Sequence, residues 1–225
     1  MKIAVIVSMN FEIELFKELE KTSKHEIKIF GTGIDNIHNV SRFGLVPAAQ
    51  TCERICNTFH PDLIISVGTC GGTKELNIGD IVVAQSCSYF DRILADHFQS
   101  YGFGNFPCYF KENFKDHGIK ICKIASSNSF IIDKLQQEYF KKTEAFAKDM
   151  ESAAIADVAF HNNIKCLVMR GVISKADEKE ASNAMENYNL GIAKVKEMLR
   201  KILNSEDLGV PPKTPRFVLL EKSYS

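Results

Sequence analysis

The chain reads Leu63-Ile64-Ile65-Ser66-Val67-Gly68-Thr69-Cys70-Gly71-Gly72 near the end of its first third. Its first half is a β-branched, apolar run typical of a strand buried on both faces of a parallel sheet. The glycines predict a loop at the end of that strand, where the backbone can approach a ligand closely and offer N–H donors. A tight turn between two strands is the alternative. The spacing is neither GxGxxG nor GxxxxGK[ST], so binding of a dinucleotide or a P-loop triphosphate is unsupported.

Strand-like and helix-like segments alternate on both sides of this stretch. Further strands are expected at residues 2–7, 26–30, 80–84, 119–125 and 165–170, and helices at 11–19, 47–59, 131–140, 151–161 and 184–203. This alternation predicts an α/β fold with a largely parallel central sheet. No linker composition interrupts residues 1–205, so we expect one domain there. Residues 206–225 contain three prolines and are expected to form an extended tail.

Composition and charge narrow the class of protein. The 225 residues carry 28 Lys and Arg against 28 Asp and Glu. Zero net charge argues against a nucleic-acid partner, because binding to phosphate backbones depends on clustered basic side chains. No apolar run approaches the roughly 18 residues of a membrane span, and the N-terminal run is too short for a signal peptide. The seven cysteines form no CxxC pair. We expect a cytoplasmic protein, away from membranes, that acts on a small molecule without a metal or cofactor.

Polar or glycine-rich residues follow four of the expected strands, at residues 8–12, 68–72, 126–130 and 170–174. In open α/β sheets, ligands bind beyond the carboxyl ends of the strands. If the strands are parallel, the four segments converge on one crevice.

A second informative stretch is Lys148-Asp149-Met150-Glu151-Ser152-Ala153-Ala154-Ile155-Ala156. Acidic residues suit the first turn of a helix, where they interact favourably with its dipole. The dipole does not account for the methionine between the two acids. Nor does it account for the small residues that follow, which predict a helix packed very close to a neighbour. The stretch therefore indicates a functional site.

Four stretches together resemble 5'-methylthioadenosine/S-adenosylhomocysteine nucleosidases: residues 1–12, 61–72, 78–81 and 148–156. Phe90-Asp91-Arg92 and Tyr101-Gly102 make the chain most similar to the plant-type members. The resemblance implies a single-domain, three-layer α/β/α nucleoside phosphorylase-like fold with a mixed central sheet. It also implies hydrolysis of an adenine nucleoside such as 5'-methylthioadenosine to adenine and the thioribose, a step of methionine salvage.

The resemblance further implies roles for individual residues. Glu12 resembles the water-activating base, Glu151 the carboxylate that grips the ribose hydroxyls, and Phe130 the ring that stacks on the base. An oxocarbenium-like transition state suits such carboxylates. The other expected substrate-binding residues are Met9, Thr69, Cys70, Gly71, Met150 and Arg170. The alternatives are that Met9 and Phe130 are core residues and that Glu12 is a solvated helix residue.

One position separates hydrolysis from phosphorolysis. Related phosphorylases carry an arginine two residues before the first glycine of the glycine-rich stretch, where its bidentate fork suits phosphate. This chain has Ser66 there, which favours water as the nucleophile. A phosphorylase with an unrecognised phosphate site is the alternative.

The chain departs from the family at the general acid. Ungapped, Ser174 occupies the position of that acid; a shift of one residue places Lys175 there, and Asp177 matches a later acid. A nucleoside-binding protein with weak or lost catalysis is therefore a further alternative. Arg42 replaces a glycine and is either a surface residue or a group that selects an anionic ligand.

The segment between Ser88 and Phe110 is rich in aromatic residues and too apolar to be left in water. In similar nucleosidases this region meets a two-fold partner. We expect a homodimer.

Overall fold

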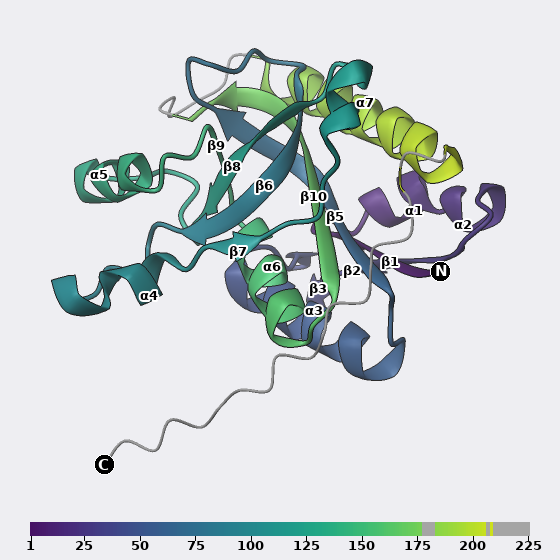
Figure 1. Ribbon diagram of the computed structural model, residues 1–225, viewed down its shortest axis with the longest axis horizontal. Helices are drawn as coiled ribbons and strands as arrows, with labels where there is room; N and C mark the ends of the chain where they lie inside the picture. The colour runs from purple at the N-terminus through teal and green to yellow at the C-terminus, as the bar shows by residue number, and fades with distance from the viewer. Residues whose placement is uncertain (177–182, 206–207, 209–225) are drawn as a thin grey trace.

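The computed structural model describes residues 1–176, 183–205 and 208 of the chain (Figure 1). The expected C-terminal tail lies outside the described residues, apart from Leu208. Asp177 lies outside them as well. The division into a domain over residues 1–205 and a tail stays a prediction.

The described strands form a mixed sheet. Its members are β1 (Lys2–Val7), β2 (Glu26–Gly31), β5 (Leu63–Gly72), β6 (Ile81–Tyr89), β7 (Phe106–Pro107), β8 (Lys120–Ser126), β9 (Ala147–Asp149) and β10 (Lys165–Lys175). Strands β2, β1, β5 and β10 are parallel, whereas β6 runs antiparallel to β10 and β9 antiparallel to β5. Because β10 pairs with both β5 and β6, the strands β5, β10, β6, β8 and β9 close into a ring.

The described helices cover both faces of this sheet. They are α1 (Glu12–Phe16), α2 (Leu19–Thr22), α3 (Leu45–Thr58), α4 (Gln99–Phe103), α5 (Lys134–Lys142), α6 (Ser152–His161) and α7 (Ala184–Asn204). A short hairpin of β3 (Ile34–Asp35) and β4 (Val40–Ser41) precedes α3. No helix within the described residues combines the length and the hydropathy that crossing a membrane requires.

Alternation along β1 shows how the three layers form. Ala4 and Ile6 join the core beneath α3 and α6, whereas Ile3, Val5 and Val7 join the core beneath α1, α2 and α7. Successive side chains of a strand point to opposite faces, so a strand that is apolar throughout is buried on both. In Figure 1, α7 accordingly lies across the sheet from α3 and α6. The α/β fold with a mixed central sheet is confirmed.

The prediction of a glycine-rich loop at residues 68–72 is wrong. These residues form the second half of β5, paired with β10 from Gly68↔Arg170 to Gly72↔Lys175. Gly71 and Gly72 serve close packing in a strand, because a Cβ at either position would come within 3.3 Å of neighbouring atoms. A Cβ at Gly72 would come within 2.9 Å of the side chains of Leu76 and Val172. Glycine in a strand can therefore signal a crowded neighbour as well as a turn.

Two expected helices also differ from those observed. The helix expected at residues 11–19 is split into α1 and α2. The helix expected at 131–140 starts later, because Asp133 and Gln136 form a capping box that begins α5 at Lys134. The tight packing expected after Glu151 is confirmed: the alanines of α6 are buried, and the Cys52 thiol of α3 lies 3.7 Å from the Ile155 carbonyl oxygen.

Candidate active site

A cavity of about 370 Å³ opens where several strands end. All four segments that the sequence predicts to converge contribute to it: residues 8–12, 68–72, 126–130 and 170–174. Its lining includes Ser8, Met9, Glu12, Phe43, Gly68, Thr69, Cys70, Gly71, Ser129, Phe130, Lys148, Asp149, Met150, Glu151, Ile173, Ser174, Lys175 and Tyr188. The predicted convergence on one crevice is confirmed.

Glu12 is the first residue of α1 and is only 2% exposed, so the alternative of a solvated helix residue is wrong. Its Oε2 accepts the backbone N–H of Met9 at 3.0 Å, and its Oε1 accepts the hydroxyl of Tyr188. Burial raises the pKa of Glu12, and the hydrogen bonds from Tyr188 and Met9 oppose that rise. The result is a desolvated carboxylate with both oxygens held in place.

Glu151 lies between β9 and α6 and is 8% exposed. Its Oε1 accepts the N–H of Gly44 at 2.9 Å. Gly44 has a φ of 99°, which favours glycine, and it caps the N-terminus of α3. Burial and the neighbouring charge of Asp149 raise the pKa of Glu151 to about 7. Two carboxylates therefore face one cavity.

The raised pKa of Glu151 predicts a pH-dependent cost in stability. The folded chain keeps this proton between about pH 4.5 and pH 7, whereas the unfolded chain has lost it, so the free energy of unfolding falls as pH rises through that window. Glu151→Gln removes this titration, and its amide oxygen can still accept the Gly44 N–H. We expect the variant to gain about 3 kcal/mol over the wild type between pH 4 and pH 8. Urea unfolding at several pH values measures the difference. The exposed Glu138→Gln serves as a control, and equal pH dependence in Glu151→Gln and the wild type would contradict the prediction.

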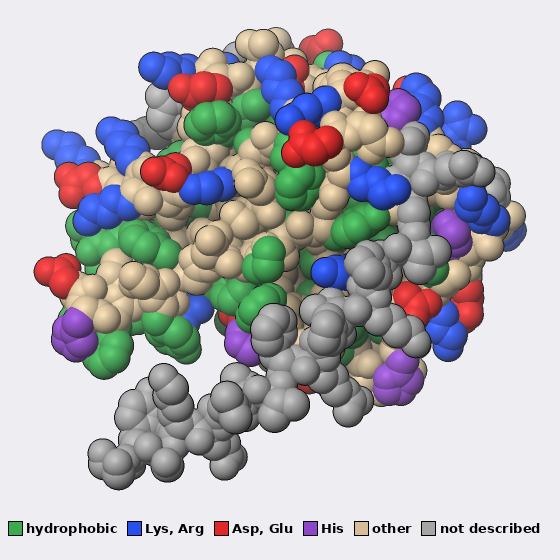
Figure 2. Space-filling view, viewed as in Figure 1, with side chains coloured by type: hydrophobic (Ala, Val, Ile, Leu, Met, Phe, Trp, Pro, Cys, Tyr) green, Lys and Arg blue, Asp and Glu red, His purple; other side chains and the backbone are tan. Residues whose placement is uncertain are grey.

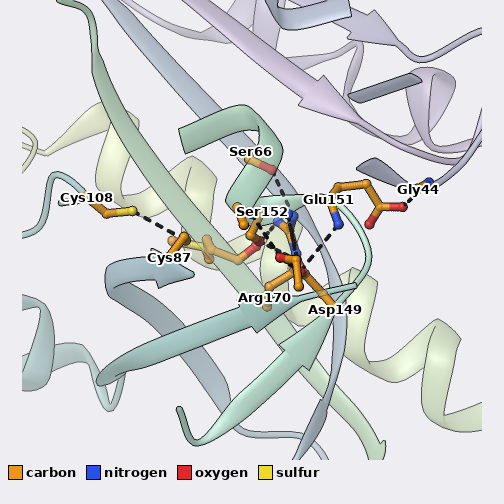
Figure 3. A network of polar contacts seen from close by, with 11 residues as sticks. Gly44, Ser66, Cys87, Cys108, Asp149, Glu151, Ser152 and Arg170 are labelled. Carbon is orange, nitrogen blue, oxygen red and sulfur yellow. Dashed lines mark hydrogen bonds and ion pairs between the residues drawn. The ribbon is translucent and has the colours of Figure 1, made fainter. Parts of the chain in front are cut away.

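A buried ion pair joins Arg170 to Asp149 (Figure 3), and Asp149 lines the cavity. The Arg170 Nε donates to Asp149 Oδ2 at 2.8 Å, and both side chains are 1% exposed. The guanidinium also donates to Ser66 Oγ at 2.9 Å and to the Met169 carbonyl at 3.1 Å. That Arg170 binds substrate stays a prediction. Arg170 is not part of the cavity lining, because its donors are directed into this network.

Asp149 organises the start of α6 rather than lying in its first turn. Its carboxylate accepts the backbone N–H of Ser152 at 3.2 Å and the hydroxyl of Ser126 at 2.5 Å. One charged group thus holds β8, β9, β10 and the start of α6 together. Glu151, two residues away, is fixed by the same anchor.

The other expected substrate-binding residues line the cavity: Met9, Thr69, Cys70, Gly71, Phe130 and Met150. Phe130 is 66% exposed, and Met9 is only half-buried, so neither is a core residue. Burial raises the pKa of Cys70 well above its ordinary value, which keeps the thiol neutral beside the cavity. All seven cysteines are free and buried.

The candidates for the general acid occupy different places. Ser174 lines the cavity beside Gly71, its partner in the register of β5 and β10. Lys175 also lines it, but its Nζ donates to the Leu76 carbonyl at 2.6 Å. Arg42 is absent from the lining, and its guanidinium donates to Gln50 at 2.8 Å.

Phe43, Lys148 and Tyr188 are among the lining residues for which the sequence predicted no role. Lys148 is the first residue of the stretch 148–156, so its place beside Asp149 and Glu151 could have marked it as a site residue. Tyr188 lies in a helix that the sequence predicts only from the spacing of apolar residues. Nothing in the neighbouring sequence predicts its contact with Glu12. Among the described residues, no three His, Cys, Asp or Glu side chains are grouped so that they could hold a metal ion.

Comparisons with known proteins agree with this geometry. The family model of the phosphorylase superfamily matches residues 2–204. The 5'-methylthioadenosine/S-adenosylhomocysteine (MTA/SAH) nucleosidase of Buchnera aphidicola is 27% identical over 91% of this chain and 98% of its own length. The 5'-methylthioadenosine nucleosidase of Arabidopsis thaliana is 28% identical over 79% of this chain and 69% of its own. A crystal structure of an MTA/SAH nucleosidase aligns with a TM-score of 0.83 and 26% identity, covering 90% of this chain and 94% of the other.

The resemblance to nucleosidases and the nucleoside phosphorylase-like fold that it implied are thereby confirmed. The match to the family model runs through every strand of the sheet and through every segment that lines the cavity. This chain belongs to the phosphorylase superfamily.

Proposed function

We propose that the protein is an N-ribosyl hydrolase that cleaves the glycosidic bond of an adenine nucleoside such as 5'-methylthioadenosine, releasing adenine and the thioribose. One observation carries the proposal: two buried carboxylates, Glu12 and Glu151, face a cavity that also presents the exposed ring of Phe130. An aromatic face suits a purine, and carboxylates suit a sugar that becomes cationic. The nucleosidase names of the relatives support the same reaction.

In this reaction the bond between C1' and the base nitrogen breaks, and its electrons leave with adenine. Glu151, held by the Gly44 N–H, binds the ribose hydroxyls and stabilises the positive charge on the sugar. A water attacks C1' and gives a proton to Glu12. That proton returns through solvent to the departing adenine, so the overall reaction neither gains nor loses a proton.

We assign to Ser174 the role of donating a hydrogen bond to the departing adenine. Its hydroxyl lines the cavity and can donate a hydrogen bond, although it is a weaker acid than a carboxylic acid. Ser174→Ala tests this role: loss of one hydrogen bond of about 1 kcal/mol is expected to lower kcat/KM about fivefold. An unchanged Ser174→Ala together with a strongly activated Ser174→Asp would instead favour a binding protein whose catalysis has been lost.

Water is preferred over phosphate as the nucleophile for a structural reason. Ser66 is buried and hydrogen-bonded to Arg170, and that guanidinium is neutralised by Asp149. The position that would hold phosphate in a phosphorylase therefore offers no free arginine fork to the cavity.

The function is tested by incubating the protein with 5'-methylthioadenosine or adenosine, with and without phosphate, and measuring free adenine. We expect release at the same rate in both buffers. Release that depends on phosphate, with a ribose 1-phosphate product, would show a phosphorylase. No release from either nucleoside, in the presence of measurable nucleoside binding, would show a binding protein.

We also propose that the protein acts as a homodimer in the cytoplasm. Figure 2 shows hydrophobic side chains gathered over the region of α4 and α5, and the exposed apolar residues there include Ile93, Leu94, Phe98, Tyr101 and Leu135. Apolar surface of this kind is typical of an interface. The free cysteines suit a reducing compartment. A monomeric sedimentation profile at micromolar concentration or recovery of the protein in an oxidising compartment would contradict these proposals.

A further inference from the structure

Tyr188 connects α7 to the start of α1. It lies in the second turn of α7, and its side chain lines the cavity. Its hydroxyl donates to Glu12 Oε1, and its ring meets the ring of Phe11 edge-on, with centroids 5.8 Å apart and planes at 61°. A single side chain of α7 therefore contacts two consecutive residues of another element.

The orientation of the Glu12 carboxylate depends on contacts from outside α1, because little within this helix fixes it. The helix is five residues long, and Phe11 at its N-cap provides no side-chain hydrogen bond. The Met9 N–H restrains Oε2 of Glu12, and the Tyr188 hydroxyl restrains Oε1. Two donors on different oxygens restrict rotation of the carboxylate about its last bond.

We propose that Tyr188 is a positioning residue, whose hydroxyl holds the Glu12 carboxylate in the orientation and the ionised state needed to take a proton from the attacking water. This inference rests on the proposed hydrolase function. Tyr188 acts through Glu12 and takes no proton itself.

The electrostatics at Glu12 agree with this role. Burial raises the pKa of Glu12; the Tyr188 hydroxyl, the backbone N–H groups of Met9 and Ser8, and the charge of Arg170 on β10 lower it. Glu151, after β9, is a neighbouring acid, and the charge of Glu12 contributes to raising its pKa. Burial and the charge of Glu12 raise the pKa of Tyr188, so its hydroxyl stays protonated and remains a donor. Without the Tyr188 hydroxyl, one of the groups that oppose the effect of burial is lost. The pKa of Glu12 then rises further, which favours the protonated carboxyl group.

Tyr188→Phe tests the proposal, because it removes the hydroxyl and keeps the ring that packs on Phe11. The pKa of Glu12 is measured by NMR in protein labelled at the glutamate carboxyl carbon, with the signal assigned by its absence in Glu12→Gln. We expect the Glu12 signal to titrate about one pH unit higher in Tyr188→Phe. We also expect kcat to fall and KM to change little, and the acid limb of the pH–kcat profile to move to higher pH by the same shift as the Glu12 signal.

Tyr109→Phe is the matched control. The Tyr109 hydroxyl donates to the Leu208 carbonyl at 2.5 Å, and Tyr109 is not part of the cavity lining, so its loss should leave the titration of Glu12 unchanged. A Glu12 titration in Tyr188→Phe identical to that of the wild type overturns the proposal, whatever the rate of adenine release. A shifted titration in a protein that releases no adenine would support the Tyr188–Glu12 coupling and contradict the proposed hydrolysis.

Discussion

Glu12→Gln is expected to lower kcat for adenine release by about 10²–10⁴-fold, the range for loss of a general base. The amide is nearly isosteric and can still accept the Tyr188 hydroxyl, but it cannot take a proton from water. Because Glu12 is buried among partners that fix its two oxygens, no other side chain easily replaces it. Steady-state kinetics should therefore show a loss in kcat with little change in KM.

The matched control for this prediction is Glu14→Gln. Glu14 lies on the same helix, but its side chain is 74% exposed and pairs with Lys17. We expect this variant to keep the activity of the wild type. If Glu12→Gln kept more than about a tenth of the wild-type kcat, Glu12 would not be the general base, because general-base catalysis contributes at least about 10²-fold.

Arg170→Met is expected to lower the free energy of unfolding by about 3–5 kcal/mol. The substitution removes the only positive charge that the described contacts give to Asp149, and it leaves that carboxylate buried without compensation. It also leaves Ser66 without its donor. The effect is measured by chemical unfolding at neutral pH.

Arg170→Lys distinguishes loss of charge from loss of geometry. Lysine keeps the positive charge, but it cannot reproduce the three contacts that the guanidinium makes with Asp149, Ser66 and Met169. Its stability should fall between those of the wild type and Arg170→Met. Lys17→Met, which breaks the exposed pair with Glu14, should cost under about 1 kcal/mol. A cost for Arg170→Met no greater than that of Lys17→Met would show that the buried pair does not stabilise the fold.

The two stability predictions describe opposite effects of the same burial. Removing Arg170 leaves a buried carboxylate without its counter-charge, whereas removing the charge of Glu151 relieves a loss of stability that develops between about pH 4.5 and pH 7 and persists at higher pH. The charge of Asp149 is thus balanced by Arg170, whereas the charge of Glu151 is not fully balanced by its surroundings. Such a carboxylate is suited to stabilising a cation that develops on a substrate.

The sequence by itself determined most of the strands, the order of the elements and the convergence of four polar segments, because these follow from local apolar periodicity and from the edge at which strands end. The resemblance of its motifs to those of nucleosidases also singled out Glu12 and Glu151. The sequence did not determine whether Gly68 to Gly72 turn or continue as a strand, since both need small residues. That choice depends on β10, which lies about a hundred residues further along the chain.

Only the tertiary structure decided how Arg170 and Tyr188 are used. Arginine at the end of a strand suits a ligand contact equally well, and its direction toward Asp149 and Ser66 follows from closure of the strands into a ring. Tyr188 and Glu12 are 176 residues apart, and neither residue alters the local pattern of the other. Local sequence encodes the conformation and the burial of a segment; the partner of a buried polar group is chosen by the packing of distant segments, because desolvation makes an unpaired group costly.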